Sequence, residues 1–166
     1  MSGFGFMHSY EFFDAQGNLM WREEIHNQMP QDGVDYAAKA LFGDTPAIGV
    51  FYVGLYAGNV VPSLALKASD LQSTLLEFTK YSEPGRPQWQ RVYDNTSMID
   101  NLANRAEFTI TEDARLYGGF LVSSNVKGGN TGVLLSVARF DSPRDVTAGG
   151  TFKIGAGLGL VPAATY

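Results

Sequence analysis

Hydrophobic and polar residues alternate along much of the chain, and this period of two predicts β-strands. In residues 106–111, Ala106, Phe108 and Ile110 fall on one face and the polar residues between them fall on the other. Residues 47–58 are apolar on both faces, which is typical of a central strand buried on both sides. Further strands are predicted at residues 87–93, 116–124, 132–140 and 151–155.

Two of these predicted strands carry details that the structure can check. In residues 87–93, the side chains of Trp89, Arg91 and Tyr93 would share one face. In residues 116–124, two adjacent glycines predict a bulge or a close approach of another backbone. The segment SPRDVTAGG, between the predicted strands at 132–140 and 151–155, reads as a loop.

Residues 10–27 concentrate charged side chains, and a period of two predicts a β-hairpin here. Arg22, Glu24 and His26 fall on one face, while Glu23 interrupts the opposite, apolar face. The connection from Asp14 to Gly17 fits a short turn in which the glycine has a positive φ. A catalytic role for Glu24 and His26 is the alternative, but charge runs of this kind are usually solvated faces.

The chain contains one convincing helix, which follows residues 27–31. Asp32 is positioned to cap its N-terminus, and Gly43 is a suitable C-terminal stop. Apolar residues recur at helical spacing, so this face is predicted to pack inward: Val34, Ala37, Ala38 and Leu41. Residues 59–80 fit either a short helix or a loop that returns to a strand near Phe78.

Seven to nine short strands and a single helix predict a mainly β fold, an antiparallel β-sandwich (jelly-roll-like) with one helix packed on it. The 19 glycines, 13% aromatic residues and only 17% charged residues agree with tight turns and β packing. No repeat or linker divides the chain. We therefore expect one domain, residues 1–166, with an N-terminal arm or hairpin at 1–29.

The residue pattern gives little support for catalysis. The chain has no cysteine and two histidines, and His8 shares a face with Tyr10 and Phe12, which favours a packed or exposed ring over a metal ligand. No G-x-S-x-G elbow is present, and GGNTG and GAGLG lack the helix that follows a phosphate loop or dinucleotide fingerprint. We predict a non-enzymatic protein without catalytic, cofactor-binding or metal-binding residues.

Several acidic and aromatic residues leave alternatives open. Glu83 and Arg86 can pair across a Pro-Gly turn and so hold a loop. The acids at 112–113, Asp141 and Asp145 lack neighbours that would separate two pKa values, as acid–base catalysis requires. A group of aromatic side chains fits either a sugar-binding face or core packing, with packing the simpler interpretation: Tyr52, Tyr56, Trp89 and Tyr93.

Charge and hydropathy limit the classes of partner that we expect the chain to bind. The net charge is −5, and Lys and Arg are scattered rather than grouped, which argues against nucleic acid as a direct partner. No signal peptide is visible and no apolar run approaches the roughly 18 residues of a membrane span. We expect the chain to fold in a cytoplasm and not to enter a membrane.

The order of several short motifs is more specific than any one of them. F-x-D-x-x-G-N-L-x-W-R-E is followed by N-x₅-G-x-D-Y-x₄-L-F-G, then by Y-V-G-L, Y-S-E-x-x-R-P-x-W, F-T-I-T, Y-G-G-F-L-V-S and R-F-D-S-P-R-D-V-T-A-G-G-T-F-K-I. Over roughly residues 10–155, this order resembles a family of small structural proteins encoded in the virion modules of tailed bacteriophages. The resemblance implies no catalytic residues.

The resemblance implies a structural role in a virion, and the chain is short for a major shell protein. The first expectation is a head decoration (cement) protein that binds the major capsid protein or other virion proteins and forms a homo-oligomer, with a trimer favoured. It would be made in the cytoplasm of the host bacterium. The alternatives are a collar, neck, tail or host-binding component, and a carbohydrate-binding β-sandwich.

Overall fold

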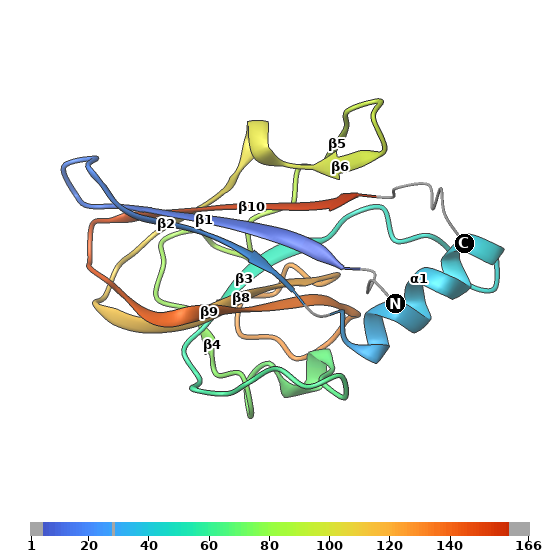
Figure 1. The fold of residues 1–166 in the computed structure, drawn as a ribbon. Helices are drawn as coiled ribbons and strands as arrows, with labels where there is room; N and C mark the ends of the chain where they lie inside the picture. Colours follow the sequence, from blue (N-terminus) through green and yellow to red (C-terminus); the bar gives the residue numbers. More distant parts are fainter. Residues whose placement is uncertain (1–4, 28, 160–166) are drawn as a thin grey trace.

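A computed structural model of the protein describes residues 5–27 and 29–159, and two antiparallel β-sheets lie face to face (Figure 1). Sheet A has the order β2 (Leu19–His26), β1 (Phe6–Phe13), β10 (Thr151–Gly159), β6 (Met98–Asp100) and β5 (Val92–Tyr93), and β7 (Ala106–Thr109) pairs with β10 beside β6. Sheet B has the order β4 (Glu77–Phe78), β3 (Tyr52–Tyr56), β8 (Ala114–Val122) and β9 (Leu134–Val146). The predicted antiparallel β-sandwich with one helix is confirmed.

The main core lies between the two sheets and is rich in aromatic rings. Tyr10 and Phe152 of sheet A meet Phe140 of sheet B, and the rings of Tyr10 and Phe140 are 4.8 Å apart in an edge-to-face arrangement. Such edge contacts add to the free energy gained by burying the rings. The alternation predicted at residues 106–111 is confirmed, because Ala106, Phe108 and Ile110 are buried in this core.

A second apolar cluster covers the outer face of sheet B. Tyr56 and Phe120 point to this face, where Leu71 and Leu75 of the excursion at residues 57–76 pack on them. The excursion holds a short 3₁₀ helix, η1 (Ala68–Asp70), and returns as β4, which resolves the alternatives for residues 59–80. Sheet B is therefore buried on both faces, which explains the unbroken apolar sequence of β3 (Tyr52–Tyr56). The strand predicted at residues 47–58 is wrong before residue 52, because that segment lies outside the sheet and Ala47 and Gly49 are exposed.

The helix α1 (Gln31–Phe42) lies at one end of the sandwich, but two details of its prediction were wrong (Figure 1). Pro30 occupies the N-cap position, and the Asp32 carboxylate accepts a hydrogen bond from the Leu134 backbone N–H of β9 instead. Gly43 ends the helix with a φ of 82°, as predicted. The helix turns Gly33, Tyr36, Ala37 and Ala40 toward the domain, whereas Val34, Ala38 and Leu41 are exposed.

Contact with β9 explains which face α1 turns inward. A Cβ added at Gly33 would lie 2.6 Å from the Leu135 carbonyl oxygen, so the first turn rests directly on the backbone of β9. On the same side, the Tyr36 hydroxyl accepts a hydrogen bond from the Ile48 backbone N–H. Backbone proximity at a glycine decides the orientation of this helix, and the hydrophobic pattern alone did not reveal it.

The predicted hairpin at residues 10–27 is β1–β2, and it is an integral part of sheet A. Gly17 has a φ of 84°, and its N–H donates to the Asp14 carbonyl across the turn. β1 pairs with β2 on one edge and with β10 on the other. The segment therefore lies within the sheet rather than extending as an arm.

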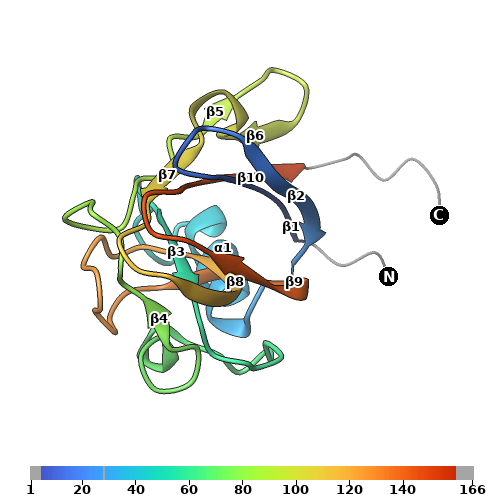
Figure 2. The same cartoon turned by 90° about the vertical axis from the view of Figure 1, so that its left-hand side faces the viewer.

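Glu23 links the two sheets along the edge where β2 of sheet A lies beside β9 of sheet B (Figure 2). Its carboxylate points inward and accepts hydrogen bonds from the Asp141 backbone N–H, at 2.7 Å, and from the Arg144 guanidinium, at 2.8 Å. Arg144 also lies over the Trp21 ring. The charged residue that interrupts the apolar face of the hairpin therefore links sheet A to sheet B.

Two strand predictions need correction. Trp89 does not share a strand face with Arg91 and Tyr93: it is buried, its indole N–H donates to the Ala156 carbonyl, and only Val92–Tyr93 forms β5. The predicted loop after residue 140 instead continues β9 as far as Val146, with Pro143 inside it. β9 is the edge strand of sheet B, where a proline removes no ladder hydrogen bond. The predicted interruption at Gly118 is confirmed, since the β8–β9 register shifts there.

Candidate functional site

A serine and a histidine meet in the core in a pairing that also occurs in hydrolases. The His8 Nε2 atom lies 2.6 Å from the Ser136 Oγ atom, and its Nδ1 atom lies 3.0 Å from the Tyr10 hydroxyl oxygen. The Asn27 side-chain amide also donates to Ser136. β1 supplies His8 and Tyr10 and β9 supplies Ser136, so this cluster joins the two sheets.

Burial makes this cluster structural rather than catalytic. His8 and Ser136 are both 0% exposed, so no substrate reaches the hydroxyl. Burial lowers the pKa of His8 to about 3, which leaves the ring neutral and a weak base near pH 7. A tyrosine hydroxyl, not a carboxylate, occupies the third position, so nothing stabilises an imidazolium. The sequence analysis favoured a packed or exposed ring, and His8 is packed, against a serine that lies 128 residues away in the sequence.

The second buried polar cluster is an ion pair between Glu77 and Arg86, whose side chains are both 0% exposed. The guanidinium makes two parallel bonds of 2.8 Å to the carboxylate, and it also donates to the Ser124 and Gly129 carbonyls. Gln72 donates to the same carboxylate. The cluster fastens the loop at 123–133 and the turn at 83–87 to β4.

The expected pair of Glu83 with Arg86 does not form. Glu83 instead accepts hydrogen bonds from the Thr109 backbone N–H and hydroxyl, at 3.0 and 2.9 Å, which ties the turn to β7. A close sequence spacing suggested the wrong acid, because Glu77 lies nine residues before Arg86 and reaches it only through the fold.

Three of the remaining acids singled out in the sequence have structural partners, whereas Asp141 is exposed. Asp145 pairs with Arg115 at 2.7 Å on the exposed side of β9, and Asp113 accepts a hydrogen bond from the Ala148 N–H. Glu112 pairs with Lys80. Arg22, Glu24 and His26 lie on the exposed face of β2, as predicted. Within residues 5–27 and 29–159, no three histidine, aspartate or glutamate side chains come together as ligands for a metal.

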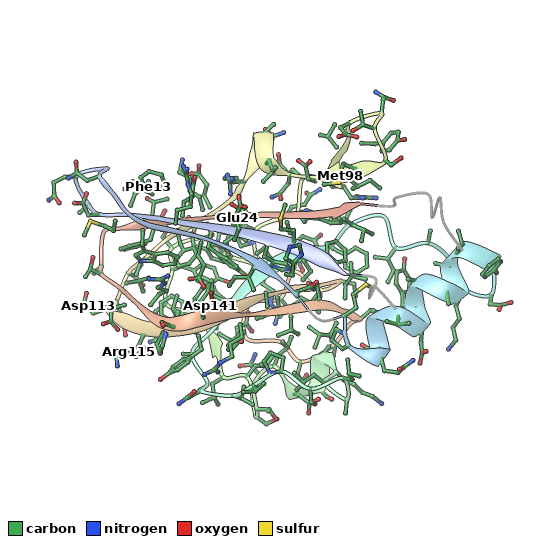
Figure 3. The ribbon with its side chains drawn as sticks, in the orientation of Figure 1. Phe13, Glu24, Met98, Asp113, Arg115 and Asp141 are labelled. Carbon is green, nitrogen blue, oxygen red and sulfur yellow. The ribbon has the colours of Figure 1, made fainter. Side chains whose placement is uncertain are left out.

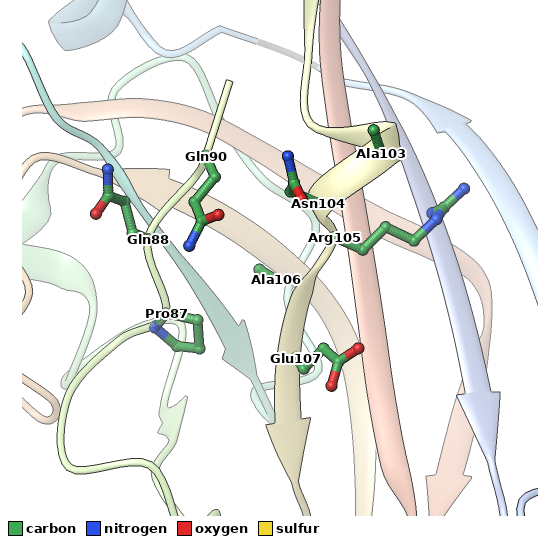
Figure 4. A pocket seen from close by; sticks show the side chains of 8 residues that line it. All are labelled: Pro87, Gln88, Gln90, Ala103, Asn104, Arg105, Ala106 and Glu107. Carbon is green, nitrogen blue, oxygen red and sulfur yellow. The ribbon is translucent and has the colours of Figure 1, made fainter. Parts of the chain in front are cut away.

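The hollows of the described surface are open grooves rather than deep pockets. One groove measures about 490 Å³ and lies between the segment before β5 and the strand β7. Gln88 and Gln90 form one side, Asn104 and Glu107 form the other, and Arg105 points away toward β1 (Figure 4). Arg105 instead donates to Ser9, at 2.9 Å. The groove therefore offers amide groups and one carboxylate but no converging catalytic set.

The aromatic residues considered as a sugar-binding face do not form one. Trp89 and Tyr56 are 4% and 0% exposed, so neither ring can stack on a ligand. Burial also raises the pKa of the Tyr56 hydroxyl. Tyr93 is exposed on β5 of sheet A, whereas Tyr52 and Tyr56 belong to β3 of sheet B. The rings of Trp89 and Tyr56 contribute to packing, which was the simpler interpretation, whereas Tyr93 does not.

Exposed apolar side chains are the remaining distinctive feature of the surface. They include Leu41 and Phe42 at the end of α1, Val61 and Leu64 in the loop of the excursion, and Val92 and Tyr93 on β5. In the interior the side chains fill the space between the sheets, while Phe13, Glu24 and Met98 lie on the outer side of sheet A (Figure 3). We take these three groups of exposed apolar side chains as the candidate functional site and call them the α1, loop and β5 sites.

Comparison with known proteins finds no family model that matches the chain and no curated protein that is similar to it. No helix in the described part of the chain has the length and apolar character needed to cross a bilayer.

Proposed function

We propose that this protein is a structural component of a tailed-bacteriophage virion, and that it decorates the outside of the head through protein–protein contacts. The observation that carries the proposal is the contrast between inside and outside. The buried charges and the His8–Ser136 pair are engaged within the domain, while large apolar side chains stand in solvent at the α1, loop and β5 sites. The order of motifs that resembles phage virion proteins supports the same role.

The free energy gained by burying the exposed apolar side chains is enough for a weak protein–protein contact that is repeated many times. Fully burying one leucine, valine or phenylalanine contributes roughly 1.5–3 kcal/mol, so a few of them give one weak interface. Many copies on a symmetric shell convert weak contacts into firm attachment. A homo-oligomer seated on a lattice axis, such as a trimer, fits this logic, with the major capsid protein or another virion protein as partner.

The surface charge fits a location outside the packaged DNA. The net charge of −5 and the scattered cations disfavour contact with phosphate groups. A cysteine-free domain also folds without disulfides in the cytoplasm of the host, before it joins a particle.

The test is to add purified protein to heads that lack it and to measure the melting temperature of the heads. We expect binding and a rise of several degrees. Val92→Asp and Val61→Asp place a charge in the β5 and loop sites and should weaken binding. Asn130→Asp adds the same charge at an exposed polar position and serves as the matched control. Failure of the unaltered protein to bind heads would contradict the proposal.

Two alternatives use the same surface differently. A collar, neck, tail or host-binding position would need the same compact domain, and imaging of the particle separates it from a head position. A carbohydrate-binding function is favoured by one observation, the amide-lined groove formed by Gln88, Gln90 and Asn104. Glycan-array binding that is lost in Gln90→Ala would support that function.

A further inference from the structure

The outward face of α1 consists of four apolar residues that no part of the described domain covers. Leu41 and Phe42 are 77% and 79% exposed, Val34 is 40% exposed, and Ala38 lies between them on the same face. The α1 outer face is defined by these four residues. The other side of the helix already packs on β9 through Gly33 and on residues 48–51 through Tyr36.

This helix thus turns its more apolar stripe to solvent. Residues 34, 38, 41 and 42 recur at intervals of three and four, which brings them together on one side of the helix. Such a stripe normally packs on another element, and here the domain interior takes a glycine, two alanines and one tyrosine instead. The stripe matches what one helix presents to another across an interface.

The distribution of side-chain sizes along the face suits a second copy in the antiparallel direction. Ala38 is the small residue at the centre, Val34 lies four residues before it and Phe42 lies four residues after it. When the same helix approaches in reverse about a two-fold axis at Ala38, each Val34 faces the Phe42 side chain of the other copy. The small central residue then allows the two backbones to approach closely.

The charges beside the face are self-complementary in the same arrangement. Asp35 and Lys39 lie along one flank of the α1 outer face, one turn apart. An antiparallel copy keeps its flank on the same side but reverses its order, so Asp35 of each copy lies near Lys39 of the other. Two opposite-charge pairs then border the apolar contact, which offsets the repulsion between two molecules of net charge −5.

We propose that the α1 outer face is a two-fold contact with a second copy of this chain. The inference rests on the proposed function for its biological role, because on a virion shell it adds a two-fold contact between copies of the proposed homo-oligomer. On a shell, this contact joins copies in pairs across a two-fold axis, and neighbouring trimers can be linked in the same way.

The first test measures molecular mass against concentration by sedimentation, on the purified protein without heads. We expect the mass to rise from 18.0 kDa toward twice that value as the concentration approaches about 1 mM. Leu41→Asp should weaken the association at least tenfold, since a charge replaces an apolar side chain in both copies. Val126→Asp alters an exposed valine far from α1 in the sequence and should leave it unchanged.

The second test addresses the antiparallel geometry. Asp35→Lys and Lys39→Asp should each weaken association about threefold to tenfold, and the double reversal should restore it, because only the paired arrangement regains opposite charges. The absence of cysteine permits a direct check as well. Ala38→Cys should form a disulfide-linked dimer on mild oxidation, and Val126→Cys should not.

A mass that stays at the monomer value, or an Ala38→Cys variant that does not crosslink faster than Val126→Cys, would overturn this inference. Neither result would bear on head binding, which is measured separately with added heads. Conversely, a dimer that forms through α1 but does not bind heads would support the contact and contradict the proposed function.

Discussion

Glu77 and Arg86 show how a single pair of residues organises several segments of the loop region. The pair is fully buried, and its hydrogen bonds reach β4, the turn at 83–87 and the loop at 123–133. Breaking a buried pair from one side leaves the other charge without a partner in a medium that solvates it poorly.

We therefore expect Glu77→Gln to lower the free energy of unfolding by about 3–5 kcal/mol, measured by urea denaturation. Asp145→Asn is the matched control, because it removes a carboxylate whose pair with Arg115 is more than half exposed. That control should leave stability unchanged. Equal effects of the two substitutions would contradict the structural role assigned to the buried pair.

The buried His8 makes stability depend on pH. Its pKa is about 3 in the folded state, whereas the ordinary value of 6.5 applies to the unfolded chain, so below pH 6.5 the unfolded chain binds a proton that the folded protein does not. Stability from this group is therefore present above pH 6.5 and is lost as the pH falls toward 3. Between pH 7 and pH 5 the loss amounts to about 2 kcal/mol.

Urea unfolding at several pH values between 7 and 5 measures how the free energy of unfolding changes with pH. In the His8→Gln variant this change should be smaller over the same interval. The NMR signals of the His8 ring provide a second measurement on the unaltered protein. They should show no titration between pH 7 and pH 5, and a midpoint near 6 would contradict the burial argument.

The sequence predicted local partners of residues better than distant ones. The turn at Asp14–Gly17 and the outward charges of β2 followed from spacing alone. The partners of Glu23 and Glu77 did not, because Arg144 and Arg86 reach them only through the fold. In particular, the sequence showed Glu23 as a charged residue that interrupts an apolar face, but it did not show that Glu23 links β2 to β9.

At the scale of elements, α1 gives the sharpest comparison between pattern and structure. Its existence and its stop at Gly43 were predictable, because the helical period and the terminal glycine are local signals. Its orientation was not, because the periodic apolar face competes with the close approach of Gly33 to β9. The contact between the backbones of α1 and β9 therefore determines which face of the helix turns toward the domain.

Gly33→Ala separates these two effects by the sign of the change. Helix propensity alone would stabilise the variant by up to about 1 kcal/mol. The added methyl group would lie 2.6 Å from the Leu135 carbonyl oxygen, so we expect a net loss of about 1–3 kcal/mol in the free energy of unfolding.

The matched control is Gly49→Ala, where an added Cβ meets no atom within 4 Å. It should leave the denaturation midpoint unchanged or slightly higher. A Gly33→Ala variant as stable as this control would show that α1 does not rest on β9 as described.

Strand predictions succeeded where one face is buried and the other is solvated. Residues 106–111 alternate because β7 has one buried face, whereas β9 continues through charged residues and a proline that read as a loop. An edge strand tolerates charged residues and proline, so the amino-acid composition did not indicate that the strand continues there. The double burial of sheet B likewise appeared only as an unbroken apolar run.

At the scale of the whole molecule, the architecture is a two-sheet domain with apolar sites on its outside. Cross-sheet ties at Glu23 and at the His8–Ser136 pair lock the two layers together. The groove between the segment before β5 and the strand β7 is open and carries no converging catalytic set. A domain of this kind is suited to be held between other proteins, which is the central claim of the proposed function.

Imaging of purified phage particles tests that claim most directly. The account predicts density that fits this two-sheet domain on the outside of the head, repeated around the symmetry axes of the shell. Complete absence of the protein from purified particles would contradict it.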